Sequence, residues 1–131
     1  MLNLQFDHYT IRVTNLERSS RFYMDVLGLK EIKNRTEKSN IRWFSMGGNM
    51  ELHINEGEKE NISTTVGVHM AMRLRNFDAF IEHIEKNKIT LHNSKGEPNC
   101  ITIRTDGIRQ VYFQDPDGYW IEVNEAELLY S

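Results

Sequence analysis

The chain has 131 residues, a formal net charge of −3, 39% apolar residues and 27% charged residues, which is the composition of an ordinary folded domain. Acidic and basic residues are intermixed without a basic stripe, so nucleic acid is not expected as a partner. No run of about 18 consecutive apolar residues occurs, so the sequence predicts no membrane span.

The first half of the sequence predicts the element order β-α-β-β-β. Apolar and polar residues alternate over residues 6–13, which indicates a strand. Asn15 suits the N-cap of a helix, because its side-chain oxygen can accept a backbone N–H, and Gly28 suits the helix stop. Three further strands are expected at residues 31–32, 41–46 and 50–55.

The second half predicts the same order. A strand over residues 68–74 precedes a helix that begins at Asn76 or Asp78 and ends near Asn87. The run Asp-Pro-Asp-Gly at residues 115–118 is a strong turn signal. The expected strands are 90–92, 100–103, 111–113 and 119–123. The remaining segments are a polar linker at 56–65 and a short tail at 125–131, where a helical turn is expected.

The two halves share residues at a fixed offset of 61 positions. The matching pairs are His8 and His69, Arg12 and Arg73, Asn15 and Asn76, and Leu16 and Phe77. Each half also ends in a short apolar strand that carries a carboxylate, Glu51 or Glu122. We therefore expect a single α+β domain of two tandem βαβββ modules, about 5–56 and 66–125, in which curved mixed sheets surround a cavity and the helices lie outside.

Side-chain parity gathers the polar candidates on one face of each sheet. Because successive side chains alternate across a strand, Leu52 and Ile54 point away from Glu51, and Ile121 and Val123 point away from Glu122. The polar set comprises His8, Arg12, Glu51, Asn55, His69, Arg73, Trp120 and Glu122. A sheet that curls around this face would form a cavity with a polar floor.

The candidate metal ligands are His8, Glu51, His69 and Glu122, at places that the repeat suggests are equivalent. Imidazole nitrogen and carboxylate oxygen suit a divalent first-row ion such as nickel, zinc, cobalt, iron or manganese. Such an ion can polarise a carbonyl, and a loosely held carboxylate can move protons. The residues alone leave a second interpretation open, in which these side chains are ordinary strand-surface groups.

Two parts of the sequence resemble signatures of the vicinal-oxygen-chelate superfamily, which includes glyoxalases, bleomycin resistance proteins and dioxygenases. Residues 6–13 and 21–29 resemble its opening pattern, H-x-x-[LI]-x-V followed by F-Y-x-x-V-L-G-[LF], and residues 115–122 resemble its closing signature. The resemblance covers nearly the whole chain. It implies two βαβββ modules that form a cup around a metal, and a homodimer in which each metal site draws ligands from both subunits.

Within this superfamily the chain is most similar to glyoxalase I. That likeness implies His8, Glu51, His69 and Glu122 as ligands, with Glu122 and Glu51 as the catalytic proton carriers. The implied substrate is the hemithioacetal of an α-ketoaldehyde and a thiol. The implied substrate-binding residues are Arg12 and Asn55, where glyoxalase I holds the γ-glutamyl end of glutathione, together with Arg73 and Trp120. The loop 56–61 is acidic where the family enzyme carries an aromatic residue next to its glutathione site. The expected thiol is therefore not restricted to glutathione and includes other low-molecular-weight thiols.

Other functions known in this superfamily stay open. A thiol transferase of the fosfomycin-resistance type would not need Glu51, and a ring-cleaving dioxygenase would use only His8, His69 and Glu122. A non-catalytic drug-binding protein would generally lack the ligand set. An acyl-CoA epimerase would carry glutamine at position 51.

The sequence also carries an expectation about localisation. Cys100 is the single cysteine, which excludes an internal disulfide. The N-terminus lacks a basic region followed by an apolar stretch, so no export signal is expected. Both features favour a cytoplasmic protein.

Overall fold

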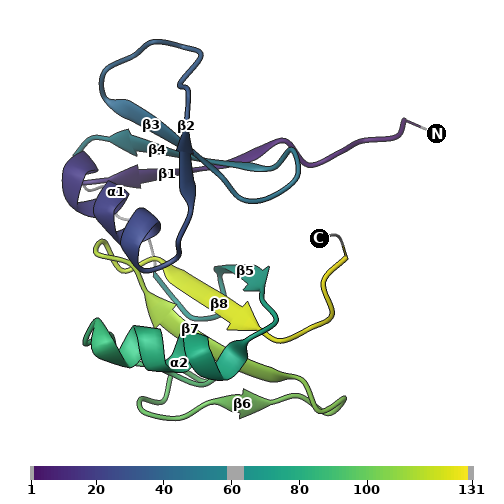
Figure 1. The fold of residues 1–131 in the computed structure, drawn as a ribbon. Helices are drawn as coiled ribbons and strands as arrows, with labels where there is room; N and C mark the ends of the chain where they lie inside the picture. Colours follow the sequence, from purple (N-terminus) through teal and green to yellow (C-terminus); the bar gives the residue numbers. More distant parts are fainter. Residues whose placement is uncertain (1, 59–63, 130–131) are drawn as a thin grey trace. The chain divides into compact units, whose positions relative to one another are not determined.

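The computed structural model describes residues 2–58 and 64–129. The chain divides into two compact units, Met1–Ile62 and Ser63–Ser131. Within the described residues, each unit contains one four-stranded mixed sheet and one helix (Figure 1). This is the α+β architecture of tandem βαβββ modules that the sequence predicts, with sheets that do not close. Neither described helix is long and apolar enough to cross a membrane.

The first unit is built from β1 (His8–Val13), α1 (Leu16–Asp25), β2 (Lys30–Ile32), β3 (Ile41–Ser45) and β4 (Glu51–Glu56). The strand order is β1-β4-β3-β2, with β1 parallel to β4 and the other neighbours antiparallel. The parallel pair explains why α1 is needed, since parallel strands require a crossover connection. The first and last strands of the module therefore lie side by side.

The position of α1 follows from its cap and its apolar face. Asn15 Oδ1 accepts from Arg18 N at 2.9 Å, which confirms the predicted N-cap. Tyr23 is fully buried on the inner face of the helix, which packs on β3 and β4. Gly28 adopts a φ of +67°, in the left-handed region that turns the chain towards β2.

The second unit repeats the pattern with β5 (His69–Arg73), α2 (Phe77–Lys86), β6 (Thr102–Ile103), β7 (Arg109–Gln114) and β8 (Trp120–Asn124). The strand order is β5-β8-β7-β6, and β5 runs parallel to β8. α2 begins after Asn76, whose side chain accepts from Ala79 N at 3.0 Å. Phe80 of α2 packs on Phe113 of β7, with ring centroids 5.9 Å apart.

The predicted turn at residues 115–118 fixes the hairpin between β7 and β8. Asp115 is buried, and its Oδ1 accepts from the backbone N–H groups of Asp117 and Tyr119, each at 2.9 Å. Gly118 has a φ of +92°, which a residue with a side chain rarely adopts. This turn sets the register that places Tyr112 opposite Glu122.

The structure corrects the sequence prediction in three segments. Glu56 is the last residue of β4 and not the first residue of the linker, because it pairs with Val13 of β1. Residues 59–63 of the predicted linker lie outside the described residues. Residues 90–92 form no strand, and only His92 makes isolated bridges. The described part of the tail, residues 125–129, contains no helix, because Asn124 Oδ1 takes the backbone N–H of Ala126.

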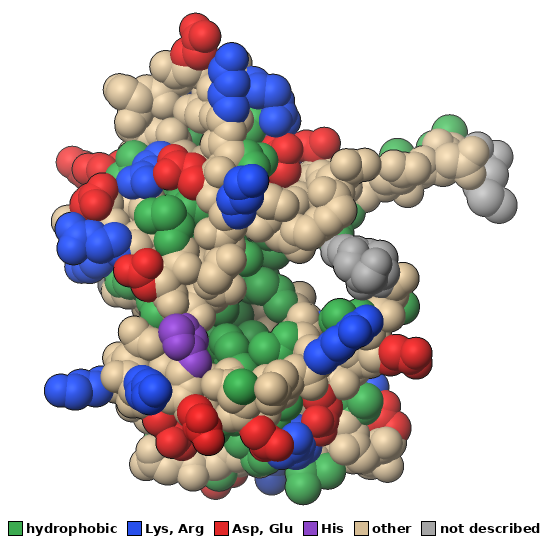
Figure 2. Space-filling model, viewed as in Figure 1, with side chains coloured by type: hydrophobic (Ala, Val, Ile, Leu, Met, Phe, Trp, Pro, Cys, Tyr) green, Lys and Arg blue, Asp and Glu red, His purple; other side chains and the backbone are tan. Residues whose placement is uncertain are grey.

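Charged side chains are distributed as the sequence indicates. Figure 2 shows acidic and basic side chains intermixed over the drawn face of each unit. Salt bridges pair them within the units, for example Arg42 with Glu31 and Arg109 with Glu125. The drawn face therefore shows no basic stripe of the kind that binds phosphate groups.

Candidate metal centre

The second unit places His69 and Glu122 in direct contact. His69 begins β5 and Glu122 lies in the middle of β8, on the same face of the sheet. His69 Nε2 and Glu122 Oε1 are 3.1 Å apart, and the Glu122 side chain is only 7% exposed. The sequence predicted both residues as metal ligands, and the sheet brings this pair together.

Three neutral donors hold the Glu122 carboxylate. Tyr112 Oη donates to Oε1 at 2.8 Å, while Gln110 Nε2 and Asn124 Nδ2 donate to Oε2 at 3.1 and 2.7 Å. Burial alone would raise the pKa of Glu122, but the hydrogen bonds from Asn124, Tyr112 and Gln110 outweigh it and lower that pKa. Glu122 is therefore an ionised, fixed carboxylate near neutrality.

The hydroxyl of Tyr112 is a permanent donor in this arrangement. Burial, and then the hydrogen bond to Glu122, raise the pKa of Tyr112 far above its ordinary value. The phenol consequently keeps its proton while it binds the carboxylate. The His69 ring also packs edge-on against Tyr112, with centroids 5.1 Å apart.

The hydrogen-bond roles at His69 fit a bound cation. Val66 O lies 2.7 Å from His69 Nδ1, and because a carbonyl only accepts, Nδ1 carries the ring proton. His69 Nε2 then faces Glu122 Oε1 at 3.1 Å, a separation that either a shared proton or a metal ion can bridge. Two ligand atoms that each lie about 2.1 Å from one ion, at right angles, are about 3 Å apart. His69 and Glu122 therefore suit adjacent positions on a divalent metal.

The first unit places His8 and Glu51 on neighbouring strands. They are direct partners in the parallel register of β1 and β4. His8 Nδ1 lies 2.5 Å from Asp7 Oδ2, so the Nδ1–H donates to the Asp7 carboxylate and Nε2 is left to bind a ligand. A carboxylate behind a ligating imidazole is the usual arrangement at metal sites.

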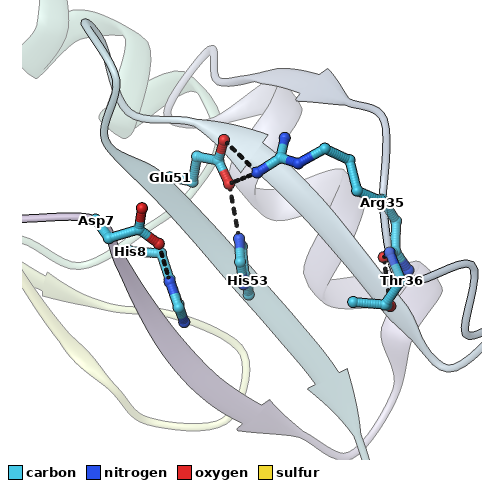
Figure 3. A network of polar contacts seen from close by, with 7 residues as sticks. Asp7, His8, Arg35, Thr36, Glu51 and His53 are labelled. Carbon is cyan, nitrogen blue, oxygen red and sulfur yellow. Dashed lines mark hydrogen bonds and ion pairs between the residues drawn. The ribbon is translucent and has the colours of Figure 1, made fainter.

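Among the described residues, Arg35 and His53 contact the Glu51 carboxylate (Figure 3). Arg35 Nη2 donates to Oε1 and Oε2 at 3.1 and 3.2 Å, and His53 Nε2 lies 2.9 Å from Oε1. The hydrogen bond from His53, followed by the opposing effect of burial and the contact with Arg35, leaves the pKa of Glu51 below its ordinary value. Glu51 is thus ionised, but Arg35 already occupies the position that a cation would take.

Strand register shows that the two glutamates are not at equivalent places in the repeat. His8 lies opposite Glu51, whereas its counterpart His69 lies opposite Trp120. The counterpart of Glu122 in the first unit is therefore His53, two residues beyond Glu51. The prediction that Glu51 and Glu122 occupy equivalent places is therefore wrong by two residues. A shift of two residues along a strand keeps a side chain on the same face of the sheet, so both glutamates still lie on the predicted face.

The predicted substrate-binding residues have varied surroundings. Arg12 packs over Gly57, where an added Cβ would lie 3.2 Å from Arg12 Cδ. Asn55 pairs with Arg12 in the strand register, and its Oδ1 is buried without a hydrogen-bond partner among the described residues. Arg73 Nη1 donates to Glu127 O at 2.7 Å, so the tail engages it. Trp120 packs edge-on against His92, at 4.9 Å.

His92 lies close to the candidate pair of the second unit. It is half-buried, it bridges Tyr112 through backbone hydrogen bonds, and its Nδ1 is buried without a partner among the described residues. Cross-strand partners share a face, so His92, Tyr112 and Glu122 form one row on the site face.

Several residues that shape the two pairs were missed by sequence reasoning. They are Gln110, Tyr112 and Asn124 around Glu122, and Arg35 and Trp43 around Glu51 and His53. Parity could have identified Asn124, which lies two residues beyond Glu122 on the same strand. Across the described residues, no group of three or more His, Cys, Asp or Glu side chains is placed to hold a metal, so each unit supplies one pair of the predicted set.

Comparison with known proteins gives the family. The family model described as Glyoxalase/Bleomycin resistance protein/Dioxygenase superfamily matches residues 5–123. The chain is 30% identical over 124 residues to the uncharacterized protein YwbC of Bacillus subtilis, covering 90% of this chain and 94% of the relative. It is 29% identical to the lactoylglutathione lyase of Salmonella typhimurium, with coverage of 92% and 91%. It is 27% identical to the metallothiol transferase FosB of Staphylococcus saprophyticus, with coverage of 93% and 77%.

A solved structure supports the same fold. The oxidase ChaP-H2 superposes with a TM-score of 0.78 at 21% identity, covering 98% of each chain. The sequence relatives include a lyase and a transferase, so similarity shows the family but does not single out one reaction. With its two βαβββ modules and a matching family model over residues 5–123, the chain belongs to the glyoxalase/bleomycin resistance protein/dioxygenase superfamily.

Proposed function

We propose that this protein is a homodimeric, metal-dependent lyase of the glyoxalase type. Its substrate is the hemithioacetal of an α-ketoaldehyde and a low-molecular-weight thiol, glutathione or another. His8, Glu51, His69 and Glu122 supply the ligands for a divalent metal, which is nickel, zinc, cobalt, iron or manganese. Arg12, Asn55, Arg73 and Trp120 contact the substrate.

The observation that carries the proposal is the pair His69 and Glu122. His69 Nε2 and Glu122 Oε1 lie 3.1 Å apart, and His69 Nδ1 donates to Val66 O. Three donors fix the carboxylate, which is how proteins orient a ligating glutamate. The similarity to a lactoylglutathione lyase over 92% of this chain supports the reaction class.

The ionised carboxylates give the protein its proton carriers. A divalent cation supplies positive charge that stabilises negative charge developing on the substrate oxygens. Glu122 and Glu51 both have lowered pKa values, so each is in the basic form that accepts a proton from carbon near neutrality. Asn55 Oδ1 lacks a hydrogen-bond partner within the described residues and suits an ammonium or amide donor of a thiol cosubstrate.

The dimer has support in the exposed apolar side chains. Leu2, Leu4, Phe6 and Tyr9 lie before and on β1, which is at the end of its sheet order, and they are 87%, 89%, 59% and 41% exposed. Exposed apolar side chains at a sheet edge are typical of surfaces that pair with another chain. A second copy of this chain is the partner that the proposal names.

The proposed reaction is tested with methylglyoxal and a panel of thiols that includes glutathione. The protein is stripped with chelator, reloaded with nickel, cobalt or zinc, and assayed for the thioester product by its ultraviolet absorbance. We expect turnover that requires the metal and is lost in Glu122→Gln but kept in Glu82→Gln, an exposed glutamate of α2. Absence of turnover with every thiol and metal would reject the lyase.

A second candidate is a thiol transferase with a three-ligand centre. Arg35 bonds to both oxygens of Glu51, which favours a site built from His8, His69 and Glu122 alone. The similarity to the metallothiol transferase FosB is consistent with this class. In that case the Glu51→Gln variant should retain the metal and still catalyse the opening of an epoxide such as fosfomycin by a thiol. If the protein is the proposed lyase, the same substitution should abolish its activity.

A further inference from the structure

The first unit contains a closed ring of contacts around Glu51. Arg35 bonds to Glu51, Glu51 bonds to His53, His53 stacks on Trp43, and Trp43 lies under Arg35. Each member of the ring is therefore held by two others. Figure 3 shows the polar part of this ring, with Arg35 and His53 approaching the Glu51 carboxylate.

The stacking in this ring is close. The rings of Trp43 and His53 are 3.9 Å apart and nearly parallel, at 3°. The Arg35 guanidinium lies 4.4 Å from the Trp43 centroid, on an aromatic face that favours a cation. On its other face, the His53 ring stacks on His8 at 4.1 Å. One buried imidazole therefore contacts both proposed ligands of this unit.

The side chains of His53 and Arg35, which both contact Glu51, differ in exposure. The His53 side chain is 10% exposed and clamped between two rings, whereas the Arg35 side chain is 61% exposed. His53 can keep its position whether or not a cation is bound. Arg35 is a fixed positive charge next to the same oxygens, so it repels any cation that binds there.

We propose that His53 is the positioning residue for Glu51 and His8, and that Arg35 is a built-in counter-ion that competes with the metal for Glu51. This proposal rests on the proposed function, because it requires Glu51 to be a metal ligand. In the metal-free protein Arg35 neutralises Glu51. A metal bound at Glu51 would replace the Arg35 contact, while His53 would keep the carboxylate oriented.

The two roles predict changes of opposite sign in metal affinity. His53→Phe keeps a ring between Trp43 and His8 but removes the donor to Glu51, and we expect affinity to weaken about 10- to 100-fold. Arg35→Gln removes the competing charge, and we expect affinity to tighten about two- to fivefold, the range of a partly exposed ion pair. Arg35→Lys restores the charge and should remove most of that gain.

The experiment measures cobalt(II) affinity of the full chain by competition with a chromophoric chelator, together with the visible absorption spectrum of the bound cobalt. His53→Gln, which can still donate to Glu51, should recover affinity relative to His53→Phe. His83→Gln, at an exposed position of α2, is the matched control and should leave affinity and spectrum unchanged. Thermal unfolding of the metal-free variants shows that each is folded.

The outcomes separate this proposal from the proposed function. If the wild type binds cobalt and both His53→Phe and Arg35→Gln bind it unchanged, the ring has no role at the metal and the inference is wrong, while the metal centre stands. If Arg35→Gln weakens binding, competition is wrong. If the wild type binds no cobalt, the proposed function fails and this inference fails with it.

Discussion

The ionised state of the buried Glu122 carboxylate depends on the side chains that donate hydrogen bonds to it. A carboxylate that is 7% exposed would normally take up a proton, yet hydrogen bonds from three neutral side chains, with a smaller electrostatic contribution from His69, keep it ionised. Glu51 is kept ionised differently, through His53 and the charged Arg35. The two proposed ligands thus begin from different states, one fixed by neutral groups and one neutralised by a cation.

Tyr112→Phe tests the donors around Glu122. The substitution removes a hydrogen bond to a buried charge, so we expect the free energy of unfolding of the metal-free protein to fall by about 1.5–3 kcal/mol. Metal affinity should weaken about tenfold, because Glu122 loses part of its orientation. Chemical denaturation and chelator competition measure the two effects.

Tyr9→Phe provides the control for this experiment, because Tyr9 is 41% exposed and its loss of a hydroxyl should cost little. An unchanged unfolding free energy in Tyr112→Phe would show that this hydroxyl does not hold the carboxylate in solution.

The sequence predicts the sheet face of each proposed glutamate ligand but not its strand register. Parity places Glu51 and Glu122 on the correct faces, because side chains alternate along a strand. It leaves their register open, since a slide of two residues keeps the same face, and here the counterpart of Glu122 is His53. Arg35 lies in a connection without any periodicity, so its contact with Glu51 depends on tertiary structure alone.

At the scale of elements, local signals account for most of the fold. Asn15 and Asn76 cap the two helices as predicted, because side-chain acceptors satisfy N–H groups within the next turn. The turn at residues 115–118 fixes one hairpin through Asp115. The short strand β6 and the bridge at His92 carry weak local signals, since pairing with β7 creates them.

Arg109 joins three elements of the second unit. It lies on β7, bonds to Asp78 of α2 at 2.8 Å and to Glu125, just after β8, at 2.8 Å, and stacks over Phe77. The hydrogen bonds from Arg109 lower the pKa of Glu125. The unfolded chain therefore binds a proton more readily than the folded one, so this contact stabilises the protein above the ordinary glutamate pKa and loses its effect as pH falls.

We expect Glu125→Gln to lower the thermal midpoint at about pH 7, and the difference from the wild type to shrink between about pH 5 and pH 3. Thermal unfolding of both proteins across this range measures it, with Glu82→Gln as the exposed control. A difference that stays constant with pH would show that the charge of Glu125 is not the cause.

At the scale of the whole molecule, the chain carries two similar units with separate cores and one ligand pair in each. The exposed apolar side chains before and on β1 suit the homodimer that the proposed function requires.

The dimer is tested by sedimentation of the wild type and a Leu4→Ser, Phe6→Ser double variant. Both side chains are exposed, so the variant should fold normally. We expect the wild type to sediment as a dimer and the variant to shift towards monomer at low concentration, because the change removes apolar area from the contact. A monomeric wild type would contradict the proposed assembly.

The central claim is a divalent metal centre that depends on the pair of His69 and Glu122, and elemental analysis tests it most directly. Protein is stripped with chelator, reloaded with an equimolar mixture of first-row divalent ions and dialysed, for the wild type, Glu122→Gln and Glu82→Gln. We expect about one ion per chain in the wild type and in Glu82→Gln, and loss of the ion in Glu122→Gln. Metal-free wild type, or equal metal content in all three proteins, would contradict the claim.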